Sequence, residues 1–201
     1  MKIQQVPLSE AKGQIRDGDL VYFDALPSWY SKGIAVAGRS PFSHVGMVYH
    51  AGSTPAIIEM DEDEGGHIIG MDKCLKRGRR LTVFRVRCSK LKALQACRHM
   101  LRLIDVEYNK PATIRLATMF APIWRWLRIR RGGLLDTATD DGANGGLGPK
   151  HCQEGASWAY RQIGIDFVKM LADWATTPGE ASKSPLMEPL FEVVLDKGVK
   201  T

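Results

Sequence analysis

The stretch of this sequence that decides the fold is SHVGMVY, residues 43–49. His44 stands near its start, and an apolar run follows in which valine and tyrosine favour a strand. The preceding segment GRSPFS, residues 38–43, has the glycine, proline and serine content of a loop. We therefore expect His44 to be held rigidly at the edge of a cleft. An imidazole in that position can exchange protons near neutral pH.

Other strand-like segments surround this stretch. Asp17-Gly18 is a turn signal, and the segment that follows it alternates as a strand over 19–24. Because the next segments are separated by turns, antiparallel pairing is favoured over a Rossmann-like sheet. The sequence predicts a four- or five-stranded antiparallel meander and one late strand. Its later strands are expected over 45–49, 56–60, 67–71, 81–87 and 191–195.

Helical periodicity marks the remaining segments. Ser28 is a candidate cap for a short helix that Gly38 ends, whereas residues 1–18 read as a lead-in with Ser9 as a candidate cap. The fold class is therefore α+β, an antiparallel sheet packed against helices that include the one begun by Cys152. The predicted helices cover 29–37, 89–105, 111–131 and 152–164.

Length and composition fit a soluble globular protein. The chain has 201 residues, of which 44% are hydrophobic and 25% charged. We expect one domain over 1–201, with an insertion at about 110–150 that ends in a glycine-rich loop. No apolar run reaches the length of about 20 residues that a membrane span needs. The N-terminal segment lacks the apolar region of a signal peptide, so a cytoplasmic location is expected, and release by lysis or by a dedicated secretion machine is compatible with it.

The net charge of +6 is concentrated in one region. All six charged residues between Lys110 and Arg131 are basic. Within this region the stretch 123–131 combines arginines with Trp124 and Trp126, as an amphipathic helix would that buries its tryptophans and exposes its arginines. The alternative is contact of this stretch with an anionic membrane or cell-wall polymer. The basic residues form one local patch, and no nucleic-acid-binding motif accompanies it in the sequence. This argues against nucleic-acid binding.

The four cysteines show no metal-binding or disulfide pattern, so free thiols are expected and no metal or other cofactor is predicted. Cys152 differs from Cys88 and Cys97, because it stands at the start of a predicted helix after a glycine-rich approach. There the helix dipole favours a thiolate, and unpaired N–H groups can receive an oxyanion. The alternative is a small buried hydrophobic side chain.

A thiol nucleophile needs a base, and His44 is the best placed of the five histidines. On its own, a histidine in this setting is more often a hydrogen-bonded structural residue. His151 is adjacent to Cys152, and neighbouring helical side chains diverge, so it is not expected to face the sulfur. His50 and His67 are expected at solvent-facing strand ends.

A third group should orient the imidazole, and Glu59 is apt because it interrupts the apolar strand 56–60. A tight turn over 52–55 would place that strand beside the one that His44 begins. The alternative is that Glu59 points outward from an edge strand.

These residues resemble a known family. The segments DGDLVYF (17–23) and SHVGMV (43–48) resemble the G-D-hydrophobic and H-hydrophobic-G elements of NlpC-like papain-fold cysteine peptidases. Since the candidate cysteine follows these elements, the order resembles the circularly permuted branch, the YiiX/YaeF-like group of amidohydrolases. Glu59, Tyr108, the Cys152 helix and Thr177-Pro178-Gly179 extend the resemblance over nearly the whole chain. Where that family often has Cys-Ser-Glu, this chain has His151-Cys152-Gln153-Glu154, and its insertion is long.

The resemblance implies a thiol-dependent hydrolase with a Cys152-His44-Glu59 triad. Its expected substrate is an amide in a peptide, a peptidoglycan-derived molecule or an acylated small molecule, cleaved through a thioester on Cys152. Tyr108 and Tyr22 are candidates for the oxyanion or substrate site. One alternative is an acyltransferase of the same fold, although the Asn-Cys-Glu-His signature of lecithin:retinol-acyltransferase-like proteins is absent. Another is an inactive module that binds a ligand or partner.

Overall fold

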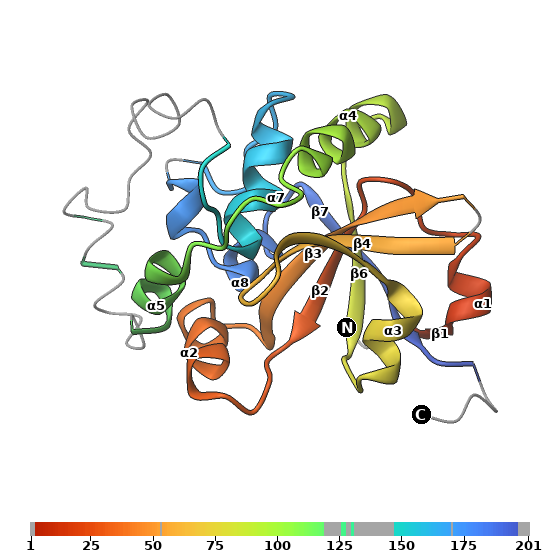
Figure 1. The fold of residues 1–201 in the computed structure, drawn as a ribbon, viewed down its shortest axis with the longest axis horizontal. Helices are drawn as coiled ribbons and strands as arrows, with labels where there is room; N and C mark the ends of the chain where they lie inside the picture. Colours follow the sequence, from red (N-terminus) through yellow and green to blue (C-terminus); the bar gives the residue numbers. More distant parts are fainter. Residues whose placement is uncertain are drawn as a thin grey trace.

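The computed structural model describes residues 3–52, 54–118, 126–127, 130, 147–169 and 171–196. In this part of the chain one sheet of seven strands has the order β1-β7-β6-β2-β3-β4-β5, with helices on both faces (Figure 1). The β1–β7 pair is parallel and all other neighbours are antiparallel. The fold is therefore α+β, as the sequence predicts.

The strands, in chain order, are β1 (Gln5–Pro7), β2 (Leu20–Asp24), β3 (Phe42–Ala51), β4 (Thr54–Asp61), β5 (Gly65–Gly70), β6 (Leu81–Val86) and β7 (Met187–Val194). The helices are α1 (Leu8–Ala11), α2 (Trp29–Ala37), α3 (Met71–Lys76), α4 (Lys90–Leu101), α5 (Lys110–Thr118), α7 (Cys152–Arg161), α8 (Pro178–Ala181) and the 3-10 turn η1 (Asp173–Ala175).

Strand β2 lies near the middle of the sheet and is buried on both faces. Its side chains alternate, so that Leu20 and Tyr22 join one hydrophobic cluster while Val21 and Phe23 join another. An unbroken apolar run is what a strand covered on both sides requires. We call these clusters the α7-side core, which lies between the sheet and helices α4 and α7, and the α3-side core, which involves α1 and α3.

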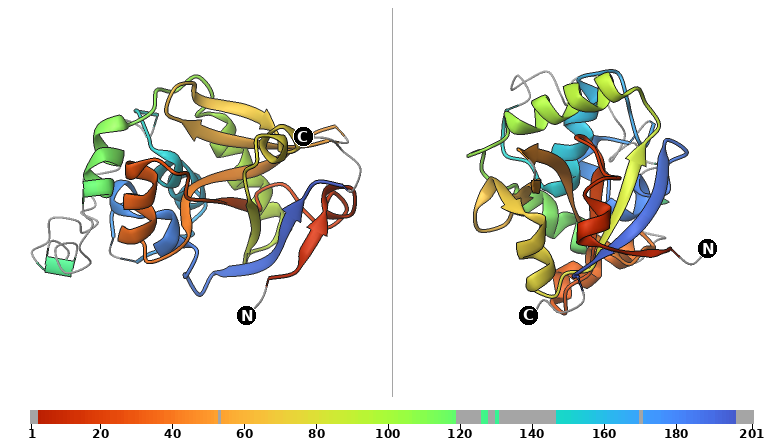
Figure 2. Two further views of the ribbon diagram at one scale, coloured as in Figure 1. Left: turned by 90° about the horizontal axis from the view of Figure 1, so that it is seen from below. Right: turned by 90° about the vertical axis from the view of Figure 1, so that its right-hand side faces the viewer.

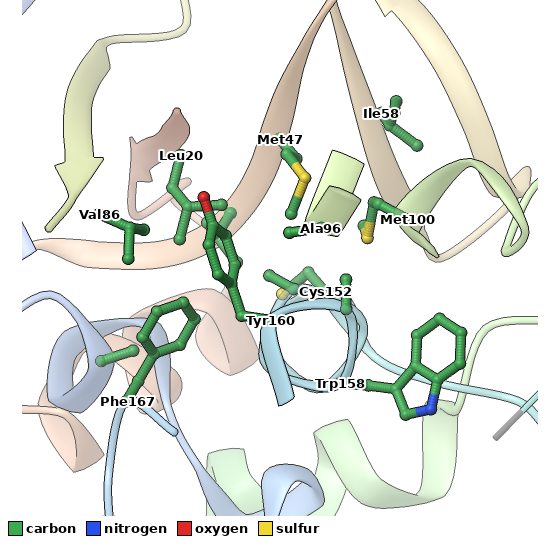
Figure 3. Close-up of a cluster of buried hydrophobic side chains, with 14 of the residues drawn as sticks. Leu20, Met47, Ile58, Val86, Ala96, Met100, Cys152, Trp158, Tyr160 and Phe167 are labelled. Carbon is green, nitrogen blue, oxygen red and sulfur yellow. The ribbon is translucent and has the colours of Figure 1, made fainter. Parts of the chain in front are cut away.

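The α7-side core surrounds the start of the cysteine-bearing helix. Figure 3 shows Cys152 among Met47 of β3 and Ala96 and Met100 of α4, and Tyr160 of α7 points toward β2. Figure 1 places α4 and α7 next to each other above the sheet. Burial of this apolar surface is the main force that fixes α7 against the strands.

The Gly18-Asp19 element ties the sheet to both covering helices. Gly18 has φ of 86° and approaches the backbone of Ala93 so closely that a Cβ would overlap it, and its carbonyl accepts a hydrogen bond from the Tyr160 hydroxyl. The buried Asp19 carboxylate accepts two hydrogen bonds from Arg85, at 3.0 and 2.7 Å. The G-D pair is thus a structural joint between β2, α4 and α7.

The predicted meander is wrong in its last step. Strand β6 pairs with β2 and β7 rather than with β5. Helix α3 follows β5 directly, because Met71, Cys74 and Leu75 recur at helical spacing and bury one face in the α3-side core. The helix carries the chain across the sheet, and the strand expected over 67–71 ends at Gly70.

The N-terminal segment is also more structured than a lead-in. Strand β1 pairs with β7, and the two lie side by side in red and blue in Figure 2. Helix α1 is preceded by Pro7, so Ser9 is not its cap, and Ser9 instead donates to the Asp196 carboxylate. A three-residue strand carries too little alternation to be recognised from sequence.

Helix starts follow the sequence more closely than helix ends. Ser28 caps α2 and Gly38 follows its last residue, as predicted. Helix α4 starts after Ser89 but ends at Leu101, earlier than the expected 105. The predicted helix over 111–131 is described only as α5 and at 126–127 and 130.

The basic stretch 123–131, including Trp124, falls mainly outside the described residues. Within it, the Arg130 guanidinium lies 4.0 Å from the ring centroid of Trp126, which is 47% exposed. None of the helices in the described ranges is both long and apolar enough to span a bilayer.

Gly46 lies on β3 close to His44, at a point where β3 and β4 approach each other closely. A Cβ at this position would overlap the Ile57 side chain and lie 3.3 Å from the Glu59 Cβ. We predict that Gly46→Ala lowers the free energy of unfolding by about 1–3 kcal/mol through overpacking. Chemical denaturation measures this. Gly13→Ala is the control, because its nearest new neighbour would be 3.8 Å away; equal stability of the two variants would contradict the close approach.

Candidate active site

Two neighbouring strands bring His44 and Glu59 together. The tight connection between β3 and β4 pairs Gly46 with Glu59. On the other side of β3 the register shifts just beyond the pairing of Phe23 with His44, because Asp24 pairs with Phe42 and leaves Ser43 of β3 without a partner in β2. His44 Nε2 lies 2.6 Å from Glu59 Oε2. Strand β4 is internal, paired with β3 and β5, and the Glu59 side chain is only 3% exposed. The alternative of an outward-pointing Glu59 on an edge strand is therefore wrong.

Cys152 is the first residue of α7, at the position that the sequence indicates. Its residue is 3% exposed, and its thiol lies close enough to the His44 imidazole for each group to shift the pKa of the other. Because Glu59 occupies Nε2 of His44, the nitrogen left for the sulfur is Nδ1. The structure thus brings all three residues of the predicted triad together, with Cys152 beside His44 and His44 paired with Glu59.

The electrostatics favour an ion pair between Cys152 and His44. Burial opposes ionisation of Cys152, but His44 and then His151 outweigh it and lower the thiol pKa to about 5. Burial likewise disfavours the charged form of His44, but Cys152 and Glu59 raise its pKa to about 9. Burial would raise the pKa of Glu59, yet His44 and His67 hold it well below its usual range. At pH values between about 5 and about 9, Cys152 is therefore a thiolate and His44 an imidazolium.

The expectation that His151 cannot face the sulfur is wrong. His151 is not inside the helix but is its N-cap, with extended backbone at φ −87° and ψ 172°. From there its side chain folds over the first turn, accepts a hydrogen bond from the Glu154 N–H and contacts the Cys152 thiol. His151 and Glu154 together form a capping box.

The tautomer of His151 follows from its partners. The Trp174 carbonyl, 2.8 Å from Nε2, can only accept, so Nε2 carries the proton. The Glu154 N–H can only donate, so Nδ1 is the acceptor. With Nδ1 accepting from Glu154 and Nε2 donating to Trp174, a neutral ring has no further hydrogen to donate to the thiolate. We therefore attribute thiolate stabilisation to His44 before His151.

His67 is a further site residue that the sequence interpretation placed in solvent. It faces Glu59 across the β4–β5 pair, and its Nε2 lies 3.4 Å from Glu59 Oε1. Its Nδ1 lies 3.2 Å from the Gly65 carbonyl. Its side chain is largely buried, so the solvent-facing prediction is wrong. His50 was expected at a solvent-facing end too, and its Nδ1 lies 2.7 Å from Asp17 Oδ1.

The two tyrosines proposed for the oxyanion or substrate site have different surroundings. Tyr22 is fully buried, and its hydroxyl has no hydrogen-bond partner in the described part of the chain. The Tyr108 hydroxyl accepts from Thr113 Oγ1 at 3.0 Å. Burial and then the Cys152 charge raise the pKa of both phenols, so both remain neutral beside the thiolate. Their roles stay predictions.

A small pocket opens beside His44. Its volume is about 60 Å³, and its wall includes residues of α2, β3 and β4. Tyr30, Asp61, Glu62, Arg79 and Tyr108 give it a polar and partly charged lining. A ligand in this pocket would reach the imidazole directly.

The other cysteines have no comparable setting. Burial raises the pKa of Cys74 and of Cys97 to about 12 and also raises that of Cys88. All four thiols are free, as predicted. Over the described ranges, no three His, Cys, Asp or Glu side chains are arranged to hold a metal ion.

Comparison with known proteins supports the fold. No protein-family model matches the chain, and no curated protein matches it. Among solved structures it is similar to the crystal structure of metalloprotein YiiX from Escherichia coli O157:H7, with a TM-score of 0.59 and 14% sequence identity. The match covers 88% of this chain and 97% of that one. The chain therefore has a YiiX-like α+β fold.

His151 combines a cap with a thiol contact, and two substitutions separate these roles. His151→Ala removes both and should lower the free energy of unfolding by about 1 kcal/mol. His151→Asn supplies a good capping side chain without an imidazole, so its stability should stay near that of the wild type. Thermal denaturation of the two variants measures the difference. Equal losses in both would show that the cap is not what His151 contributes.

Proposed function

We propose that this protein is a thiol-dependent hydrolase that cleaves an amide bond through a thioester on Cys152, as a permuted papain-like enzyme would. The observation that carries the proposal is the buried cluster in which the Cys152 thiol lies beside His44 and His44 pairs with Glu59 at 2.6 Å. A nucleophile, a base and a group that orients the base form the recurring arrangement for acyl transfer through a covalent intermediate. Burial among apolar side chains excludes water that would weaken the ion pair.

The first half-reaction forms the acyl-enzyme. The Cys152 thiolate attacks the carbonyl carbon, and the C–S bond forms as the carbonyl electrons move to oxygen. The backbone N–H of Cys152, at the start of α7, is the expected donor to that oxyanion. His44 then gives its Nδ1 proton to the leaving nitrogen, the C–N bond breaks, and an amine departs. Glu59 holds the ring in the orientation that this transfer needs.

The second half-reaction releases the product. Neutral His44 takes a proton from water as the hydroxyl oxygen attacks the thioester carbonyl. The C–S bond breaks, a carboxylic acid leaves, and the Cys152 thiolate and the His44 imidazolium are restored. Each cycle consumes one amide and one water and yields one acid and one amine.

The pocket beside His44 favours polar substrates. Asp61, Glu62 and Arg79 on its wall can pair with charged groups of a peptide or a peptidoglycan-derived molecule. Leu26, Ile34 and Met60 also line the pocket, but its volume of about 60 Å³ leaves no room for a long alkyl chain. We therefore place peptide-like amides ahead of acyl lipids as substrates.

The related YiiX structure is described as that of a metalloprotein. In the described part of this chain the side chains that could bind a metal do not form a suitable group. No step of the proposed reaction is routed through a metal.

Substitution of the triad tests the mechanism. Cys152→Ala and His44→Ala should each lower kcat/KM by at least about 10³-fold, because nucleophile and base act as a unit. Glu59→Gln keeps the shape of the side chain but loses its charge, and we expect it to lower kcat/KM by about 10²–10⁴-fold. Release of amine from a panel of short peptides, muropeptides and acyl amides measures the rates.

Cys88→Ala is the matched control and should retain full activity, since Cys88 is not part of the Cys152-His44-Glu59 cluster. Wild-type rates in Cys152→Ala would falsify the mechanism. Tight binding of one substrate without turnover or acylated Cys152 would instead identify a binding module. Transfer of the acyl group to an added amine in preference to water would identify an acyltransferase.

A further inference from the structure

Glu59 has two oxygens, and the triad uses only one of them. Oε2 accepts from His44, whereas Oε1 faces His67 Nε2 at 3.4 Å. With the Glu59 side chain only 3% exposed, water has little access to the second oxygen. A buried carboxylate needs a donor on each side, and His67 is the side chain that supplies the second.

Hydrogen-bond accounting fixes the protons on His67. Its Nδ1 faces the Gly65 carbonyl at 3.2 Å, and a carbonyl can only accept, so Nδ1 carries a hydrogen. The ionised Glu59 carboxylate can also only accept, so Nε2 must carry a hydrogen as well. A ring that donates from both nitrogens is an imidazolium. In the neutral form, one of these two contacts would set lone pairs against each other.

The surroundings of His67 agree with a positive charge. Glu59 faces it from β4, and Glu64 Oε2 lies 3.6 Å from Nε2 on the solvent side. The Glu59 carboxylate raises the His67 pKa, which burial only partly opposes. Around Glu59 itself stand His44 from β3 and Arg79, whose guanidinium lies 4.3 Å from the Phe23 ring centroid, together with the neutral Cys74 thiol from α3.

We propose that His67 is a positioning residue of the candidate active site, which holds the second oxygen of Glu59 and carries a positive charge that favours the Cys152 thiolate. This rests on the proposed function, because it assigns the residue to the same reaction. His67 offsets part of the Glu59 charge, so less negative potential reaches the sulfur. It also fixes the carboxylate plane, so that Oε2 stays aimed at His44.

Two substitutions separate charge from hydrogen bonding. His67→Gln keeps a donor toward Glu59 and loses the charge, while His67→Ala loses both. His50→Gln is the matched control, because His50 also pairs with a carboxylate, Asp17, but lies at the far end of β3 from His44. The readout is the rate of Cys152 alkylation by iodoacetamide as a function of pH, followed by peptide mass spectrometry.

We expect the midpoint of Cys152 alkylation to rise by about half a pH unit in both His67 variants, or about threefold in rate on the acid side. His50→Gln should follow the wild type. For the hydrolysis of a peptide amide, His67→Ala should lower kcat more than His67→Gln does, because only the glutamine holds the carboxylate. Superposition of both alkylation profiles on the wild type would overturn the proposal.

A second readout does not depend on the reaction. Nitrogen chemical shifts of the His67 ring at pH 7 should show both nitrogens protonated in the wild-type protein, and a neutral ring would contradict the proposal. Failure of the proposed function looks different, since wild-type Cys152 would then be alkylated no faster than Cys88. In that case the charge on His67 is still decided by its ring shifts, and its role in thiolate formation is rejected.

Discussion

The hydrogen bond between His44 and Glu59 is the interaction on which the candidate site depends. A carboxylate that is 3% exposed is costly to bury unless charged or donor groups surround it. His44, His67 and Arg79 supply those groups. Because Glu59 stays ionised, it can hold a protonated His44, and a protonated His44 can hold a thiolate at Cys152. The Glu59 carboxylate thus stabilises the His44 imidazolium, which in turn stabilises the Cys152 thiolate.

The sheet and its covering helices bring these charges together from distant parts of the sequence. His44 and Glu59 come from adjacent strands, whose close approach requires the glycine at position 46. Cys152 comes from α7, which packs against β3 and β4 through the α7-side core. The Gly18-Asp19 joint links α7 and α4 to β2 at the other end of the helix. Helix position and thiol position are thus set by the same packing.

Much of the site can be predicted from sequence because its signals are local. The turn over 52–55 implies that Glu59 lies beside the strand of His44, and the glycine-rich approach marks Cys152 as the start of a helix. The Cys152-His44-Glu59 geometry agrees with that interpretation, while its catalytic role stays a prediction. The YiiX-like fold is supported by the structural comparison. The permuted papain relationship rests on the sequence resemblance.

The parts that sequence did not predict depend on longer-range or finer geometry. The place of β6 beside β2 follows from a six-residue helix, α3, too short to be recognised with confidence from periodicity. His67 could have been found by counting across the β4–β5 turn, which sets it opposite Glu59. His151 could have been recognised from its spacing to Glu154, since a capping box needs a glutamate three residues after the cap. Treating it as an interior helical residue hid that role.

The most direct test of the ion pair is the pH titration of thiolate absorbance in the far ultraviolet. The difference between wild type and Cys152→Ala isolates the one thiol, because the other three cysteines are common to both proteins. If His44 and Glu59 hold the charge pair, this thiol ionises with a midpoint near pH 5. A midpoint near 9.0, the ordinary value for a cysteine, would contradict it.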